Sequence, residues 1–60
     1  MSRLVKCIDN KGVENFISIG EVYEVVMDHG LYLLLRSEKF EVYDYEVSFL
    51  KSDFEEVKDE

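Results

Sequence analysis

A turn signal near the middle of the chain, Asp28-His29-Gly30, constrains the fold most, because the segments on both sides of it have the residue pattern of β-strands. Glycine readily adopts the positive φ that a tight hairpin turn requires. Tyr23, Val25 and Met27 alternate along 21–28, and the run Leu31–Arg36 is apolar on both faces. The pattern predicts a β-hairpin whose second strand is central in a sheet.

The segment before the hairpin predicts one strand and one loop. In an extended Arg3–Asp9 segment, Val5 and Cys7 share one face, and the other face carries Leu4, Lys6 and Ile8. Turn-forming residues follow at 9–12. We therefore expect a strand that ends at this turn. The stretch 13–18 shows no sustained period and is interpreted as a loop held on the core by Phe16 and Ile17.

The segment after the hairpin predicts two more strands. A polar connection over 37–39 precedes Phe40–Tyr45, where apolar and polar residues alternate as in a strand. The stretch 47–50 lacks a clean period and is too short for a stable helix, so a single 3-10 turn is expected there. A last short strand is expected over Phe54–Val57, followed by an acidic tail over 58–60 that frays.

The composition agrees with an all-β domain. Among 60 residues there is no alanine, whereas Val and Ile contribute 11 residues and Phe and Tyr another 8. β-Branched and aromatic residues suit a pleated, half-buried surface, and this argues against a helical bundle. We predict a single domain over 1–60, a small five-stranded antiparallel SH3-like barrel, because closure protects the edges of so short a sheet.

Two stretches, Val5–Gly12 and Phe16–Val25, resemble the opening of small SH3-like proteins carried by phages and prophages of Firmicutes. The resemblance covers about the first half of the chain, and it implies the barrel fold, a phage-like origin and no assigned catalytic activity. Family members end in an aromatic-rich strand, a short helical turn and a Phe-Glu pair. Because this chain is longer at that end, Phe49 and Phe54 are both candidates for the residue that closes the barrel.

The charge of the chain restricts its partners. Seven basic and fourteen acidic residues give a net charge of −7. Such a field repels DNA and RNA and attracts a basic protein surface, although a high net charge also serves solubility. There is no apolar run of 18 residues, no basic segment ahead of an apolar stretch and only one cysteine, so we expect a protein of the bacterial host's cytoplasm, without a membrane span or a disulfide.

Catalytic and metal-binding patterns are missing from the sequence. Cys7 shares a predicted strand face with Val5 and is interpreted as a small buried hydrophobe, while His29 is placed at the tip of a turn. The spacing of His, Cys and acidic residues matches no zinc or calcium motif, and no glycine-rich phosphate loop is present. The sequence therefore predicts no catalytic residue, no cofactor and no metal.

The surplus of aromatic residues points to a surface for a partner. Alternation places Tyr23, Val25, Leu33 and Leu35 in the core. It leaves Val22, Val26, Tyr32 and Leu34 outside, as an apolar patch rimmed by carboxylates, unless a loop covers them. In the predicted fourth strand, Tyr43 and Tyr45 share a face with Glu41. The residues predicted to bind a partner are Tyr32, Leu34, Glu41, Tyr43, Asp44 and Tyr45.

These observations lead to a functional hypothesis and to alternatives from other classes. The first is a non-catalytic acidic protein-binding module, such as a phage-encoded inhibitor that docks on a bacterial host defence protein sterically or by imitating nucleic-acid charge. The alternative is a small accessory nucleic-acid-binding module of SH3-like fold, which the charge disfavours. Homodimerisation would relieve the marginal core of a small chain. An enzyme built on Cys7 and His29 would need these two residues to approach each other.

Overall fold

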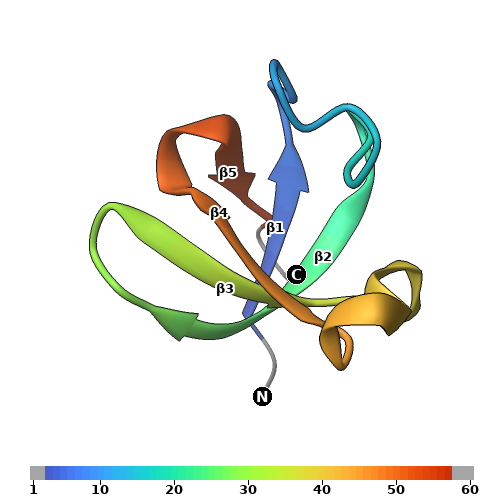
Figure 1. Ribbon diagram of the computed structural model, residues 1–60. Helices are drawn as coiled ribbons and strands as arrows, with labels where there is room; N and C mark the ends of the chain where they lie inside the picture. Colours follow the sequence, from blue (N-terminus) through green and yellow to red (C-terminus); the bar gives the residue numbers. More distant parts are fainter. Residues whose placement is uncertain (1–2, 58–60) are drawn as a thin grey trace.

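A computed structural model describes residues 3–57 as one five-stranded antiparallel sheet with two short 3-10 helices (Figure 1). The strands are β1 (Arg3–Cys7), β2 (Val22–Asp28), β3 (Tyr32–Arg36), β4 (Glu46–Leu50) and β5 (Phe54–Glu56), and the 3-10 helices are η1 (Glu38–Tyr43) and η2 (Lys51–Asp53). The strand order is β4-β3-β2-β1-β5. The predicted all-β class, the five antiparallel strands and the 3-10 turn before the last strand are confirmed. Neither of the helices within 3–57 has the length and apolar character to cross a bilayer.

The central hairpin of β2 and β3 forms as predicted. His29 N donates to the carbonyl of Tyr32 at 2.8 Å, and Gly30 N donates to Oδ1 of Asp28 at 2.8 Å. Gly30 has a φ of 91°, which an L-residue with a side chain adopts only with strain. Pairing shifts by one residue between Val25 and Met27. This β-bulge bends β2 and increases the local twist of the sheet.

Nine side chains form the core: Val5, Cys7, Ile17, Tyr23, Leu33, Leu35, Phe40, Phe49 and Phe54. Three of the four predicted core positions of the hairpin are therefore buried, and Val25 packs partly buried against them. The loop prediction is half correct, because Ile17 is buried whereas Phe16 lies on the surface. Burying each large apolar side chain contributes about 1.5–3 kcal/mol.

Aromatic rings join the two edge strands of the sheet. Phe49 of β4 and Phe54 of β5 lie with ring centroids 6.2 Å apart. Tyr23 of β2 contacts Phe54 at 6.3 Å and stacks on Phe40 at 6.0 Å. In the described part of the chain the sheet order is linear, so β4 and β5 meet through side chains rather than through a hydrogen-bonded ladder. Both candidate phenylalanines take part in this contact.

The predicted fourth strand over Phe40–Tyr45 is wrong, because most of this segment is η1. Ser37 caps the helix, its Oγ accepting a hydrogen bond from Lys39 N at 3.2 Å. Phe40 is the one fully buried side chain of this segment. A strand would bury Val42 as well, two residues further on, but Val42 is exposed. Asp44 and Tyr45 then adopt left-handed backbone, with φ of 59° and 71°, which ends the helix.

The fourth strand lies instead at Glu46–Leu50, where a 3-10 turn was predicted. Val47 and Phe49 face inward and pair with Leu35 and Leu33 of β3. Leu50 is the residue that obscured this period, because it lies on the outer face of the sheet. The 3-10 turn follows at η2, one residue beyond the predicted stretch.

The first and last strands in the sequence follow the predictions with small changes in length. β1 ends at Cys7, earlier than the predicted Asp9, and pairs with both β2 and β5. β5 covers Phe54–Glu56 within the predicted range. The tail 58–60, predicted to fray, is outside the described residues.

Candidate partner-binding surface

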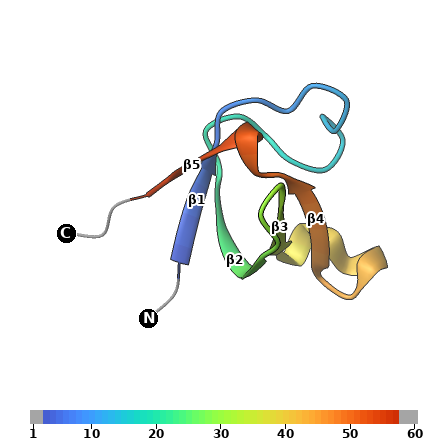
Figure 2. The same cartoon turned by 90° about the vertical axis from the view of Figure 1, so that its left-hand side faces the viewer.

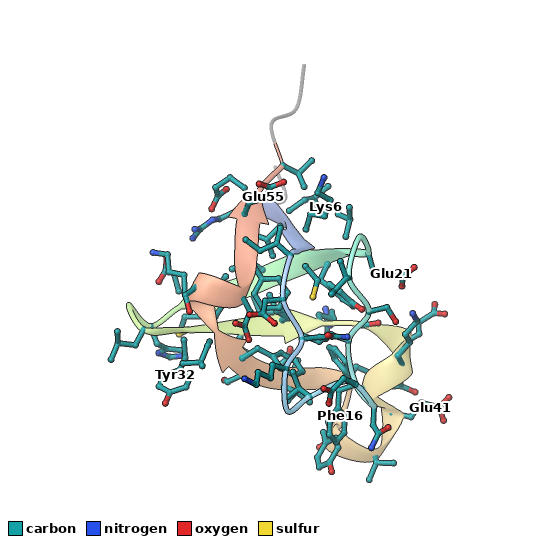
Figure 3. All side chains as sticks on the ribbon, turned by 90° about the horizontal axis from the view of Figure 1, so that it is seen from above. Lys6, Phe16, Glu21, Tyr32, Glu41 and Glu55 are labelled. Atoms are coloured by element: carbon teal, nitrogen blue, oxygen red, sulfur yellow. The ribbon has the colours of Figure 1, made fainter. Side chains whose placement is uncertain are left out.

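The six residues predicted to bind a partner lie on two separate surfaces. Tyr32 and Leu34 belong to β3, whereas the other four belong to η1 and the turn that follows it. Figure 3 shows Tyr32 and Glu41 on opposite sides of the molecule, with Phe16 close to Glu41. The prediction that Tyr43 and Tyr45 share a strand face with Glu41 is wrong, because this segment forms η1 and the turn after it.

Phe16 joins the second of these surfaces, and sequence reasoning had placed it in the core. Its ring meets that of Tyr43 edge to face, with centroids 5.9 Å apart. Phe16 N donates to the carbonyl of Val13 at 3.0 Å, and the buried neighbour Ile17 holds this part of the loop on the core. Ile17 is buried whereas Phe16 is exposed, and no period in this loop sequence distinguishes the two.

The side chain of Phe40 anchors helix η1 on the sheet. Phe40 packs on Tyr23 and on Phe49, the latter at 5.6 Å between ring centroids. Tyr45 N donates to the carbonyl of Phe40 at 2.8 Å, and the carbonyl of Tyr45 accepts from Ser37 N at 2.9 Å. These contacts hold the side chains that follow Phe40 in a defined position. Figure 2 shows η1 and the tip of the loop between β1 and β2 on the β4 side of the molecule, away from β1 and β5.

We call Phe16, Glu41, Tyr43, Asp44 and Tyr45 the acidic aromatic surface. All five side chains are exposed. Glu14 and Glu38 lie within three residues of its members and are exposed as well. Because the aromatic rings gather where two chain segments meet, this surface offers contact area that the core does not use.

The described cations that form salt bridges pair with carboxylates outside the acidic aromatic surface. Salt bridges join Arg3 to Asp28 and Glu56, Lys6 to Glu55, Arg36 to Glu46, Lys39 to Glu21 and Lys51 to Asp28. By contrast, within residues 3–57 no cation is ion-paired with Glu14, Glu38, Glu41 or Asp44. Lys39 belongs to η1 but is paired with Glu21, so the carboxylates of the acidic aromatic surface keep no ion-pair partner within residues 3–57.

A network of charges ties the far end of the sheet together. Arg3 Nη1 lies 2.8 Å from Oδ2 of Asp28, and Lys51 Nζ lies 3.0 Å from the same oxygen. Arg3 also donates to Glu56 of β5. The Arg3 guanidinium, the Gly30 amide and Lys51 hold the pKa of Asp28 well below its usual range, and Arg3 lowers the pKa of Glu56. This network links β1, β2, β5 and η2, so its role is structural.

Cys7 and His29 lie in different environments. Cys7 is buried in β1, and its Sγ donates to the carbonyl of Asp9 at 3.3 Å. Burial raises the pKa of the Cys7 thiol, and the nearby Asp53 carboxylate raises it further. His29 lies exposed in the hairpin turn. Residues 3–57 form no pocket and no group of three metal-binding side chains.

Comparison with protein-family models, with curated proteins and with solved structures finds no match to this chain. The resemblance to small phage proteins therefore stays a prediction from sequence.

Proposed function

We propose that this protein is a non-catalytic binding module whose acidic aromatic surface docks on a basic surface of a bacterial host protein. The observation that carries the proposal is the edge-to-face contact of Phe16 with Tyr43, which places exposed rings among carboxylates that no described cation neutralises. With the phage-like sequence resemblance, this favours a phage-encoded inhibitor of a host defence protein.

The two components of the surface would contribute differently to binding. Carboxylates such as Glu41 and Asp44 would steer a basic partner and raise the association rate. Tyr43 and Phe16 would provide the buried contact, because aromatic side chains bring large area at small entropic expense and are frequent hot spots. Inhibition would follow from steric cover or from occupying a surface on which the host protein binds nucleic acid.

The first experiment identifies the partner. The tagged chain is expressed in a bacterial host and recovered at moderate salt, and co-purifying proteins are identified by mass spectrometry. Direct titration of the purified partner then gives an affinity for the native chain. Because the attraction is electrostatic, we expect this affinity to fall as salt is raised.

Variants test whether the proposed surface makes the contact. Replacing Tyr43 by Ala together with Glu41→Lys and Asp44→Lys should weaken binding by at least about a hundredfold, since hot-spot residues contribute about 2 kcal/mol or more each. The control, Tyr32→Ala with Glu55→Lys, changes a tyrosine and one carboxylate elsewhere, reverses half as many carboxylates as the test variant and should bind normally. Circular dichroism checks that both variants fold. Unchanged affinity of the Tyr43 variant would overturn the proposal.

Binding of DNA or RNA is the alternative that the same material can test. Five of the described cations are already engaged in salt bridges, which leaves little positive charge for phosphate. We expect no binding of either nucleic acid below micromolar concentration at moderate salt. Salt-dependent binding in that range would replace the protein-binding proposal with a nucleic-acid module.

A further inference from the structure

Val42 is an apolar side chain of η1 that the fold leaves in water. It keeps 87% of its surface exposed, more than any other large apolar side chain within residues 3–57. Phe40, two residues earlier, supplies the contact between η1 and the core. Val42 therefore contributes little to the packing of the domain, and nearly all of its apolar area is available to a partner.

Val42 lies next to members of the acidic aromatic surface. Glu41 and Tyr43 flank it in the sequence, and the Tyr43 ring contacts Phe16 at 5.9 Å between centroids. Figure 3 shows Phe16 and Glu41 on the same side of the molecule. The most exposed apolar side chain of the described residues thus adjoins the residues already proposed to contact the host protein.

Two backbone hydrogen bonds span Val42. Asp44 N donates to the carbonyl of Glu41 at 3.2 Å, and Tyr45 N donates to the carbonyl of Phe40 at 2.8 Å. Because Phe40 is buried, this turn is fixed on the core. Valine also has one strongly preferred χ1 rotamer in helical backbone. Val42 therefore has little freedom to lose when it binds, which lowers the entropic cost of a contact through it.

The charged groups around Val42 favour a basic partner. Helix η1 and the residue after it contain three carboxylates, Glu38, Glu41 and Asp44, and one cation, Lys39, which is paired with Glu21. In the described part of the chain no cation forms a salt bridge with those three carboxylates. Basic side chains of a partner can therefore pair with them without first displacing another cation.

We propose that Val42 is the apolar anchor of partner binding, received by the host protein in a shallow apolar recess bordered by lysine or arginine. A flat surface would cover only one side of a side chain that is 87% exposed, whereas a recess removes most of that area from water. The basic border complements the carboxylates on the same turn. This inference rests on the proposed function and adds the shape and chemistry of the partner's site.

Binding kinetics of the full chain with the host protein that co-purifies with it test the anchor. Val42→Ala removes both γ-methyl groups from the recess and should weaken binding at least about tenfold. The loss should appear mainly as faster dissociation and should persist at high salt, because apolar burial is not screened. Glu41→Lys with Asp44→Lys should instead slow association, and its effect should shrink as salt is raised.

Leu31→Ala is the matched control for Val42→Ala. Leu31 is 76% exposed in the turn between β2 and β3, outside η1, so its truncation should leave binding unchanged. Thermal unfolding checks that both variants stay folded, and both should melt close to the native chain because neither side chain is in the core.

The outcomes separate this inference from the proposed function. Unchanged affinity of Val42→Ala beside a loss in the Tyr43 variant, or an equal loss in Leu31→Ala, would overturn the anchor and leave the proposed function standing. Unchanged affinity of the Tyr43 variant would overturn the proposed function and this inference with it. Recovery of no host protein would also overturn both.

Discussion

Phe49 and Phe54 meet edge to face, with ring centroids 6.2 Å apart and 62° between the ring planes, and they connect the two edge strands of the sheet. Phe49 is anchored further by Phe40, and Phe54 by Tyr23. The edges of this sheet are thus held by an aromatic contact where a hydrogen-bonded ladder would close a barrel. This arrangement makes the stability of the domain depend on a few rings.

Replacing either phenylalanine by leucine should therefore lower stability in a coupled way. In a double-mutant cycle of Phe49→Leu and Phe54→Leu, we expect a coupling free energy of about 0.5–1.5 kcal/mol, the range for paired aromatic rings. Urea unfolding followed by circular dichroism measures each variant. Additive effects would show that the two rings act independently. Phe16→Leu serves as a control, because Phe16 contacts neither ring and should not couple with Phe54.

Asp28→Asn should destabilise the protein at neutral pH and lose this effect in acid. The folded-state pKa of Asp28 is lowered, mainly by Arg3. The contribution of Asp28 is therefore complete above the unfolded pKa of about 3.9 and is lost as pH falls from there through the lower folded-state pKa. The difference in free energy of unfolding between Asp28→Asn and the native chain should be constant above about pH 5 and shrink below about pH 4. Urea titrations across this range measure it.

A matched variant checks the cause of the Asp28 effect. Glu14→Gln removes an exposed carboxylate that forms no ion pair with a described residue, and we expect little change in stability at any pH. A pH-independent difference for Asp28→Asn would mean that its charge is not the stabilising feature.

Tyr45 has a φ of 71°, in the left-handed region of backbone conformation. Left-handed backbone costs a non-glycine residue about 1–2 kcal/mol, and more when the side chain is β-branched. Tyr45→Gly should therefore keep or raise the melting temperature, whereas Tyr45→Val should lower stability by about 1 kcal/mol or more relative to Tyr45→Gly. Thermal unfolding compares the two. If Tyr45→Val were as stable as Tyr45→Gly, the backbone strain would be absent in solution.

The Cys7 thiol should react slowly while the protein is folded. Burial both blocks access and raises its pKa, which lowers the fraction of reactive thiolate at neutral pH. Alkylation by iodoacetamide should be at least about tenfold slower than in urea, as mass spectrometry of the modified chain would show. Equal rates in both conditions would place the thiol on the surface. Cys7→Ala should preserve host binding, since Cys7 is buried and is not part of the acidic aromatic surface.

Local sequence patterns were sufficient to predict a strand where one of its faces contacts the core and the other contacts water. The Asp28-His29-Gly30 turn, the alternation through β2 and the buried positions of β3 are examples, since side chains alternate strictly in a strand. The segment Phe40–Tyr45 alternates in the same way and forms η1 instead. This segment is helical because Ser37 caps its start and because Phe40 is its one buried side chain. The cap can be recognised in the sequence, whereas the burial of Phe40 cannot.

The sequence by itself determined the all-β class, the hairpin, the excess of negative charge and the surplus of aromatic residues. Only the tertiary structure decided where that charge and those rings are placed. Phe16 and Tyr43 are far apart along the chain, and their contact depends on how Ile17 and Phe40 are buried. Tyr32 and Glu41 are closer in sequence and lie on different sides. Surfaces assembled from separate segments depend on packing between them, and periodicity within one segment carries no information about that packing.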